Sequence, residues 1–338
     1  MKIALLMGPR DVRVVEQEMP VPGSGEVRVR VVAAGICGTD IDAYKGHQPR
    51  GWTITYPYRM GHEFSAMVDE VGEGVVYYKK GDKVVVDGRL PCGICYQCRR
   101  GHVNACINSS YISGGFMEYS VFPEKCLVRI PEGISFERAA FAEPLSCCLY
   151  GNRKLDIKVA DFAVVIGEGV IGLLHAQLLK IRGAEVAVVG LVPERLAVAK
   201  ELGIDHVLNA KEVDVVAEIN KLSSGKGADQ VVCAAGAEII LQQALKAAAR
   251  YGQILYFAAN LKDRVSLESD LIHYKELNLI GSYDSTTAYY EQALHLLTLD
   301  KINVDLLVTH KLPLDRAAEG FEITEKMLGL KVMLVNEI

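Results

Sequence analysis

The chain has 338 residues, 50% of them hydrophobic, which is enough for about two domains with sizeable cores. Its formal net charge is −5, and no block of like charge could follow a phosphate backbone, so we expect no nucleic-acid partner. Residues 1–20 hold neither a signal-peptide pattern nor an apolar run of membrane length, which predicts a cytoplasmic protein without a membrane partner. Nine cysteines are an odd number for a disulfide framework, and four fall within residues 92–106, which indicates metal binding.

The first 150 residues are predicted to form short strands and loops, because alternating or β-branched runs are separated by Gly, Pro and Tyr. These runs are residues 26–32, 64–71, 83–86 and 117–122.

From about residue 161 the pattern changes to apolar strands that alternate with helical stretches, which predicts βαβ units and a parallel sheet. The predicted strands are 162–166, 185–189, 229–234 and 252–257, and the predicted helices are 170–182, 193–202 and 238–249. A helix at 286–299, a strand at 304–308, a helix at 315–327 and a strand at 331–335 complete the chain.

Residues 162–172 read as a buried strand that runs into three glycines and then into a helix. The first glycine permits a tight turn, the second lets backbone N–H groups approach a pyrophosphate, and the third allows close packing of helix on strand. The pattern therefore predicts a dinucleotide site at Gly167, Gly169, Val170, Ile171 and Gly172.

Cofactor choice stays open in the sequence. An acidic residue about 20 positions later would hydrogen-bond the ribose 2′-hydroxyl, but the second strand of this region ends in Gly190. Arg195, at the start of the next helix, could reach the adenosine ribose or a 2′-phosphate, or it could be an ordinary solvated helix residue. The pattern thus allows both NAD and NADP.

Four cysteines in one loop have a spacing that can close a tetrahedron around zinc: Cys92, Cys95, Cys98 and Cys106. The alternative is four unliganded thiols at this spacing by chance. A site closed by four sulfurs leaves no position for a substrate, so its predicted role is structural.

A second set of metal-binding side chains is dispersed along the chain, at Cys37, at His62 with Glu63, and at Glu143. Each alone is more often structural than catalytic. Together they supply a thiolate, an imidazole and carboxylates, with a position left for water or a substrate oxygen, as in a catalytic zinc site. We therefore expect two zinc ions per chain.

Across its full length the chain resembles the zinc-dependent medium-chain dehydrogenases, and among them the sorbitol and polyol dehydrogenase branch. The matching motifs, in chain order, are Cys37-Gly-Thr-Asp40, Gly61-His-Glu63, Gly81-Asp-x-Val84, the four cysteines of residues 92–106, Gly114-Gly-Phe-x-Glu-Tyr119, Glu143-Pro-Leu-Ser146 and the three glycines after residue 166. The resemblance implies an α/β fold. A GroES-like, mainly-β catalytic domain would comprise residues 1–146 and 283–338, and a doubly wound Rossmann domain with a parallel sheet would comprise residues 147–282.

By this resemblance, Cys37 and His62 correspond to the first two ligands of the catalytic zinc. Glu143 stands where polyol dehydrogenases have a glutamate that binds the metal directly or through water. Glu63 is similar to the family's adjacent glutamate, which can exchange with water on the metal.

The resemblance also assigns roles around these ligands. Asp40 would orient the histidine ligand, and Thr39 would pass the proton of the substrate hydroxyl outward. Many relatives continue this proton path with a histidine where this chain has Asp42, so the path beyond Thr39 is open; His47 is either its continuation or a surface residue. Ala66 replaces a glycine that is usual in the family.

The implied reaction is the reversible oxidation of a secondary alcohol to a ketone, with hydride transfer to NAD or NADP. A glutamate in place of the usual cysteine favours a polyol or sugar alcohol, free, phosphorylated or cyclic. Threonine or a simple secondary alcohol is the alternative within the family. A third interpretation is a zinc-ribbon protein that contacts nucleic acid. The negative net charge and the glycine-rich turn argue against it.

Residues 44–59 are a candidate substrate wall, in which aromatic rings could stack on carbon chains and arginines could hold a phosphate; the alternative is an ordinary loop. The residues concerned are Tyr44, Lys45, Arg50, Trp52, Tyr56, Tyr58 and Arg59. Four further cysteines are expected to be core thiols: Cys126, Cys147, Cys148 and Cys233. Family resemblance and the apolar residues 277–280 together suggest a homodimer or homotetramer.

Overall fold

The computed structural model describes residues 1–48, 53–258 and 264–337, and it divides into two compact units. Unit 1 comprises Met1–Ser146, Ser285–Asp300 and Leu307–Ile338, and unit 2 comprises Cys147–Asp284 and Lys301–Leu306. The last of these segments was predicted to lie in the first domain. It packs with unit 2 because the Gln177 side chain exchanges hydrogen bonds of 2.7 and 3.2 Å with the backbone of Asn303.

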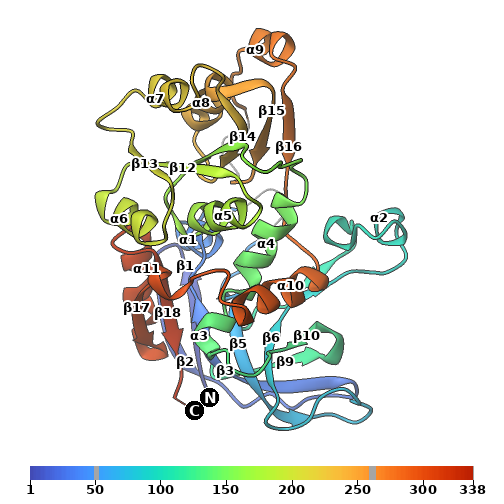
Figure 1. The fold of residues 1–338 in the computed structure, drawn as a ribbon. Helices are drawn as coiled ribbons and strands as arrows, with labels where there is room; N and C mark the ends of the chain where they lie inside the picture. The colour runs from blue at the N-terminus through green and yellow to red at the C-terminus, as the bar shows by residue number, and fades with distance from the viewer. Residues whose placement is uncertain (49–52, 259–263, 338) are drawn as a thin grey trace. The chain divides into compact units, whose positions relative to one another are not determined.

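Unit 2 is built on a six-stranded sheet in which every neighbouring pair is parallel, in the order β13-β12-β11-β14-β15-β16 (Figure 1). The strands are β11 (Phe162–Ile166), β12 (Glu185–Gly190), β13 (His206–Asn209), β14 (Ala228–Cys233), β15 (Ala248–Tyr256) and β16 (Asn278–Gly281). The helices are α5 (Val170–Ile181), α6 (Pro193–Glu201), α7 (Val215–Leu222), α8 (Glu238–Ala247) and α9 (Ser269–Tyr274).

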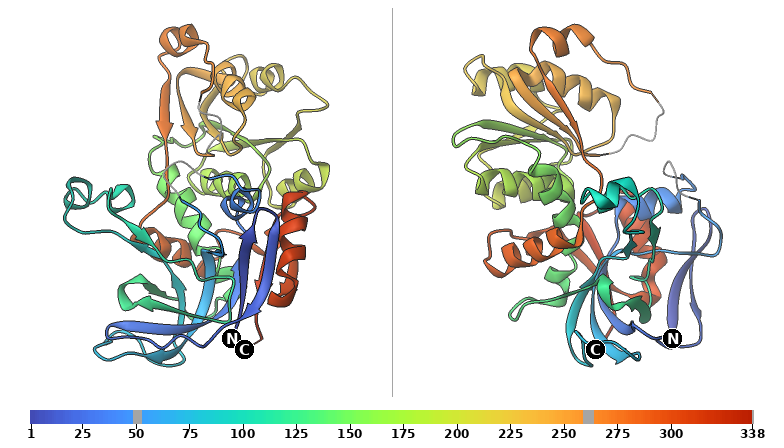
Figure 2. Two further views of the ribbon diagram at one scale, coloured as in Figure 1. Left: turned by 180° about the vertical axis from the view of Figure 1, so that it is seen from behind. Right: turned by 90° about the vertical axis from the view of Figure 1, so that its right-hand side faces the viewer.

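Helices cover both faces of this sheet, with α5 and α6 on one face and α7 and α8 on the other (Figures 1 and 2). Every residue of β11 is therefore buried, which is why the strand reads as a continuous apolar run. The strand order reverses between β11 and β14, and in such sheets ligands bind at the carboxyl ends of the strands at that point. The predicted doubly wound fold is confirmed.

Unit 1 is mainly β. Its largest sheet has the order β10-β6-β5-β3-β18-β17, with β9 also paired to β3, and a smaller sheet has the order β2-β1-β4. The strands are β1 (Lys2–Gly8), β2 (Asp11–Glu16), β3 (Glu26–Gly35), β4 (Tyr58–Arg59), β5 (Glu63–Val71), β6 (Lys83–Val86), β7 (Arg89–Leu90), β8 (Ser110–Tyr111), β9 (Tyr119–Pro123), β10 (Leu127–Arg129), β17 (Val308–Pro313) and β18 (Lys331–Val335). The helices are α1 (Gly38–Tyr44), α2 (Tyr96–Arg99), α3 (Phe136–Ala139), α10 (Thr287–Thr298) and α11 (Ala317–Glu325), and α4 (Ala142–Asn152) passes from unit 1 into unit 2.

Both ends of the chain build unit 1. Strand β18 pairs with β3, and helix α11 packs against β2 and β18, so the red C-terminal segment lies beside the blue N-terminal strands (Figure 2). The core between them includes Phe64, Phe116 and Phe321. Within the part of the chain that is described, no helix is long and apolar enough to cross a membrane.

One predicted strand is wrong. Residues 304–308 were predicted to be extended, but Asp305–Leu307 forms a 3-10 turn and the strand begins only at Val308. The Asn303 side-chain oxygen accepts a hydrogen bond of 3.1 Å from the backbone N–H of Asp305, and such local bonds compete with strand pairing.

Candidate metal centres and dinucleotide site

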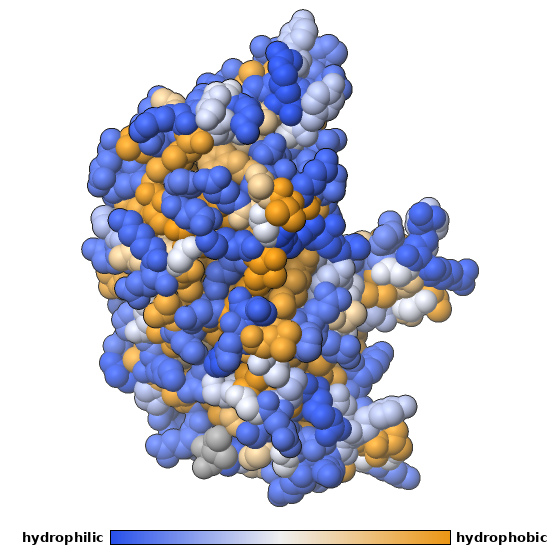
Figure 3. Space-filling view, viewed as in Figure 1, coloured by the Kyte–Doolittle hydropathy of each residue, from blue (hydrophilic) through white to orange (hydrophobic). Residues whose placement is uncertain are grey.

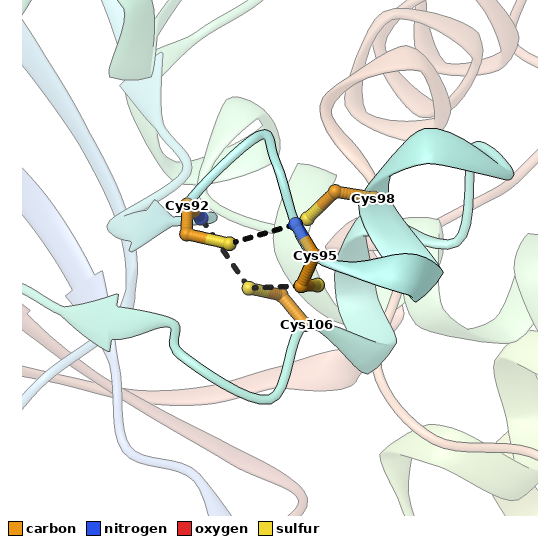
Figure 4. Close-up of side chains that lie close together, drawn as sticks. All are labelled: Cys92, Cys95, Cys98 and Cys106. Carbon is orange, nitrogen blue, oxygen red and sulfur yellow. Dashed lines mark hydrogen bonds between the residues drawn. The ribbon is translucent and has the colours of Figure 1, made fainter.

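The four clustered cysteines lie in a lobe of unit 1 whose base is the antiparallel pair β7–β8. Helix α2 and the 3-10 turn Val103–Ala105 carry the chain around the lobe. The four Sγ atoms all lie within 4.8 Å of one another, and Figure 4 shows the four side chains converging. The spacing in sequence thus corresponds to a cluster in space.

Hydrogen bonds within the lobe favour the thiolate form of Cys92 and Cys95, because backbone N–H bonds lower the pKa of both. Backbone N–H groups donate to sulfur, from Cys95 to Cys92 at 3.4 Å and from Cys92 to Cys106 at 3.3 Å (Figure 4). A bond from the backbone of Cys98 is the main reason that the pKa of Cys95 falls to about 6, whereas burial chiefly raises the pKa of Cys98 to about 12. Four thiolates this close repel one another, and a doubly charged ion would remove that repulsion, so the set fits zinc.

The lobe has almost no apolar core of its own. Helix α2 buries none of its residues, and Ile94, Tyr96 and Ile107 are exposed. Figure 3 shows apolar and polar side chains intermixed on the projecting lobe. Because so little surface is buried here, a bound metal is the natural source of the lobe's stability.

A second cluster joins Cys37, His62 and Glu63, whose ligand atoms lie within 4.8 Å of one another. Cys37 is the residue directly before α1, and His62 directly precedes Glu63, the first residue of β5. The pairing of β3 with β5 sets Gly35 opposite Glu63, and a Cβ at Gly35 would lie 2.6 Å from the Glu63 Oε2. Gly35 therefore provides the space for that carboxylate.

Asp40 holds the two halves of this cluster together. Its carboxylate accepts hydrogen bonds from the backbone N–H of Cys37 at 3.0 Å and of Gly61 at 3.3 Å. The distance between its Oδ1 and Nδ1 of His62 is 3.7 Å, longer than a hydrogen bond. Asp40 thus acts mainly through the backbone on either side of the cluster. Thr39 lies close by, with its Oγ1 3.8 Å from the Cys37 sulfur.

A buried lysine that the sequence pattern did not reveal completes the cluster. Lys331, the first residue of β18, is 4% exposed; its Nζ pairs with the Glu63 carboxylate and donates to the carbonyl of Ile36 at 3.2 Å. In the sequence it is merely a charge at the start of an apolar strand. Only the pairing of β18 with β3 brings it to the cluster.

Glu143, the fourth predicted ligand, lies outside the group of three but close enough to act on it. Burial lowers the pKa of His62, but the charges of Asp40, Cys37 and Glu143 outweigh it and raise that pKa well above its usual value. For Lys331 as well, burial lowers the pKa and nearby anions, Glu63 first, raise it. A cluster with this excess of acidic groups fits a divalent cation.

The predicted members of the substrate wall lie in different environments. Tyr44 is 6% exposed and packs on Phe321 with ring centroids 5.3 Å apart, so it is a core residue and its predicted role is wrong. Tyr56 and Tyr58 pack against the same core, while Arg59 is exposed on β4. Two further members of the predicted wall, Arg50 and Trp52, lie outside the described residues. Lys45 is half-buried.

His47 is exposed and its backbone N–H donates to the carbonyl of Asp42 at 2.9 Å, while burial raises the pKa of the half-buried Asp42. Of the predicted core thiols, Cys126, Cys148 and Cys233 are buried, and Cys147 is only half-buried.

The predicted dinucleotide site has the expected geometry in unit 2. Strand β11 ends at Ile166 and is followed by Gly167, which has φ +123°, a conformation that favours glycine. A Cβ at Gly172 would lie 1.8 Å from the carbonyl oxygen of Gly167, so only glycine allows α5 to pack this close. Gly169 precedes Val170 and Ile171 at the N-terminus of α5, and nothing lies within 4 Å of where its Cβ would be. This open, electropositive helix end fits a pyrophosphate.

The predicted ribose end of the site contains Gly190, the last residue of β12, and Arg195, in the first turns of α6. Burial lowers the pKa of Arg195, and the charge of Glu168 partly offsets this effect. Glu168 lies between the first two glycines and was not among the predicted site residues. The lack of a side chain at Gly190, which lies next to Glu168 in space, is the sequence feature that could have pointed to Glu168.

Two parts of the chain match known protein families. Residues 23–132 match the family described as "Alcohol dehydrogenase GroES-like domain", and residues 170–298 match that described as "Zinc-binding dehydrogenase".

Individual relatives match over almost the whole chain. The sorbitol dehydrogenase of Halalkalibacterium halodurans is 33% identical, covering 95% of this chain and 94% of the relative. The L-threonine 3-dehydrogenase of Pyrococcus furiosus is 34% identical, with 91% and 90% covered. The crystal structure of galactitol-1-phosphate dehydrogenase from Escherichia coli superposes with a TM-score of 0.91 at 29% identity, with 99% and 100% covered.

Proposed function

The chain belongs to the zinc-dependent medium-chain dehydrogenases and is an NAD(P)-dependent alcohol dehydrogenase, and from this premise we propose that it oxidises a secondary alcohol of a polyol or sugar alcohol to the ketone. The observation that carries the proposal is the cluster of Cys37, His62 and Glu63 with Glu143 nearby, a ligand set of thiolate, imidazole and carboxylate. A zinc ion held by Cys37, His62 and one of these carboxylates would polarise the substrate oxygen and lower the pKa of its hydroxyl.

The remaining work falls to the chain's own residues. Thr39, beside Cys37, would accept the proton of the substrate hydroxyl while it releases its own hydroxyl proton outward, so that it relays the proton without retaining it. Asp40 holds Cys37 and Gly61 in place and thereby positions the histidine ligand. The glycine loop of unit 2, from Gly167 to Gly172, would hold the dinucleotide, which supplies the hydride acceptor.

The polyol class is supported by the glutamate at position 143 and by the similarity to dehydrogenases of sorbitol and galactitol 1-phosphate. Threonine is the second candidate, because the threonine 3-dehydrogenase of Pyrococcus furiosus is as similar to this chain as the sorbitol enzyme is.

The test is reduction of NAD and of NADP by the zinc-replete protein over free polyols, phosphorylated polyols, inositols, threonine and simple secondary alcohols. Turnover confined to one polyol class is the expected result. Activity with threonine or simple alcohols alone would contradict the polyol assignment.

A Cys37→Ser variant tests the metal cluster in the same assay. We expect kcat/KM to fall by more than about 100-fold, because a weaker ligand lowers zinc occupancy at the cluster. An unchanged melting temperature with the four-cysteine zinc retained would show that the fold is intact. Full activity of this variant would refute the assignment of the cluster.

We further propose that the chain forms a homodimer through β16. This strand is one of the two edge strands of the parallel sheet in the described part of the chain, and Asn278, Leu279 and Gly281 on it are exposed. An unpaired strand edge with an apolar side chain is suited to pairing with a second copy.

A further inference from the structure

The ribose end of the dinucleotide site contains a carboxylate from an unusual place. In dinucleotide-binding folds an acidic residue at the end of the second strand hydrogen-bonds the ribose 2′-hydroxyl. Here that strand, β12, ends in Gly190, but the side chain of Glu168 reaches across from the glycine loop. A Cβ placed on Gly190 would lie 2.5 Å from the Glu168 Cδ. A side chain at position 190 and this conformation of Glu168 therefore exclude each other.

Hydrogen bonds hold Glu168 in this place. Its Oε1 accepts from the backbone N–H of Leu191 and from that of Val192, both at 3.0 Å. Val192 is the N-cap residue of the nine-residue helix α6, and its backbone N–H has no acceptor within the helix, so the carboxylate of Glu168 supplies one. The side chain is thus fixed in position by two backbone hydrogen bonds.

We propose that Glu168 selects NAD over NADP, by accepting a hydrogen bond from the 2′-hydroxyl of the adenosine ribose and by excluding a 2′-phosphate. The backbone N–H groups before a helix are the groups that would otherwise bind such a phosphate, and here a carboxylate already occupies them. A 2′-phosphate would have to displace Glu168 or lie against its negative charge.

Arg195 is the residue that would favour the opposite choice, because a guanidinium can bind a phosphate in bidentate fashion. The charge of Glu168 acts on it, however, so the positive potential that Arg195 offers to a phosphate is already partly neutralised. The inference rests on the proposed function to the extent that it assumes a dinucleotide at the glycine loop.

The experiment measures equilibrium binding of NADH and NADPH by calorimetry, in the zinc-replete wild type and in Glu168→Ala, Glu168→Gln and Glu194→Gln. Glu194 is an exposed carboxylate in the first turn of α6. Its variant therefore removes an equal charge and leaves the hydrogen bonds of Glu168 to Leu191 and Val192 in place. We expect the wild type to bind NADH at least about tenfold more tightly than NADPH. Both Glu168 variants should lower that ratio by about tenfold, and Glu194→Gln should leave it unchanged within about twofold.

Glu168→Gln keeps the size and an acceptor oxygen, so it remains informative if Glu168→Ala unfolds α6. Tighter binding of NADPH by the wild type, or an unchanged ratio in Glu168→Gln, would overturn the inference while leaving the proposed function intact. Failure of the wild type to bind either dinucleotide would refute the proposed function and this inference together.

Discussion

At the scale of single residues, the cluster in unit 1 depends on a buried ion pair. The side chains of Glu63 and Lys331 are almost completely buried, and their charges compensate each other. A buried pair contributes little net stability, but removing one partner leaves an uncompensated charge and is costly. The pair therefore holds the Glu63 carboxylate beside Cys37 and His62 in a defined position.

We predict that Lys331→Met lowers the free energy of unfolding of the zinc-free protein by about 3 kcal/mol, because Glu63 is then buried without a counter-charge. The loss should be smaller in the zinc-loaded protein, where the metal supplies positive charge. Urea unfolding with and without chelator measures both values.

The matched control is Lys326→Met, which breaks the exposed pair with Glu322 and should cost less than about 0.5 kcal/mol. A Lys331→Met variant as stable as this control would contradict the role assigned to the buried pair.

At the scale of elements, two short segments carry most of the site chemistry. The turn from β11 into α5 depends on glycines with different tasks, since Gly172 allows close packing and Gly169 leaves an open space. The cysteine lobe depends on four sulfurs in place of an apolar core. We make one prediction for each segment.

Gly172→Ala should destabilise the protein by about 2 kcal/mol or more, because the added methyl group meets the Gly167 carbonyl and α5 must shift. Gly169→Ala should cost less than about 1 kcal/mol, since nothing opposes its methyl group, but should weaken dinucleotide binding. Thermal unfolding together with NADH titration separates the two effects. Equal losses of stability in the two variants would contradict this division of tasks.

Cys98→Ser should reduce the zinc content from two ions per chain to one, because a hydroxyl is a poor replacement for the fourth thiolate of the lobe. Metal analysis after dialysis measures this. Cys147→Ser is the control, since this half-buried thiol is in neither metal cluster, and it should retain both ions. Two ions per chain in Cys98→Ser would mean that the lobe does not hold zinc through all four sulfurs.

At the scale of the whole molecule, unit 1 is formed by both ends of the chain and unit 2 by the segment between them, with a short return of residues 301–306. The edge strand β16 lies in unit 2 and offers the sheet for pairing with a second copy.

The proposed dimer predicts that the wild-type protein has about twice the chain mass of 37.0 kDa in light scattering after size-exclusion chromatography. Leu279→Glu should shift the protein to the monomer, because a charge on the edge strand β16 opposes strand pairing. The melting temperature of the monomer fold should not fall. Leu328→Glu, at an exposed site of unit 1, should leave the mass unchanged. A monomeric wild type, or a dimeric Leu279→Glu variant, would refute the dimer through β16.

Local spacing by itself determined the features whose parts are close in the chain. The turn around Gly167 and the four-cysteine lobe could be predicted because a few consecutive residues set their geometry. The alternation of buried strands and helices predicted the parallel sheet for the same reason, since hydrophobic periodicity is a local property.

Tertiary structure alone decided the contacts between distant parts. Lys331 meets Glu63 across 268 positions only because β18 and β5 both pair with β3, and no local pattern distinguishes it from a surface lysine. Tyr44 turned out to be core because α11 supplies Phe321 from the other end of the chain. Glu168 reaches Leu191 only because β11 and β12 lie side by side. Such contacts depend on strand order and register, which the packing of the whole unit determines.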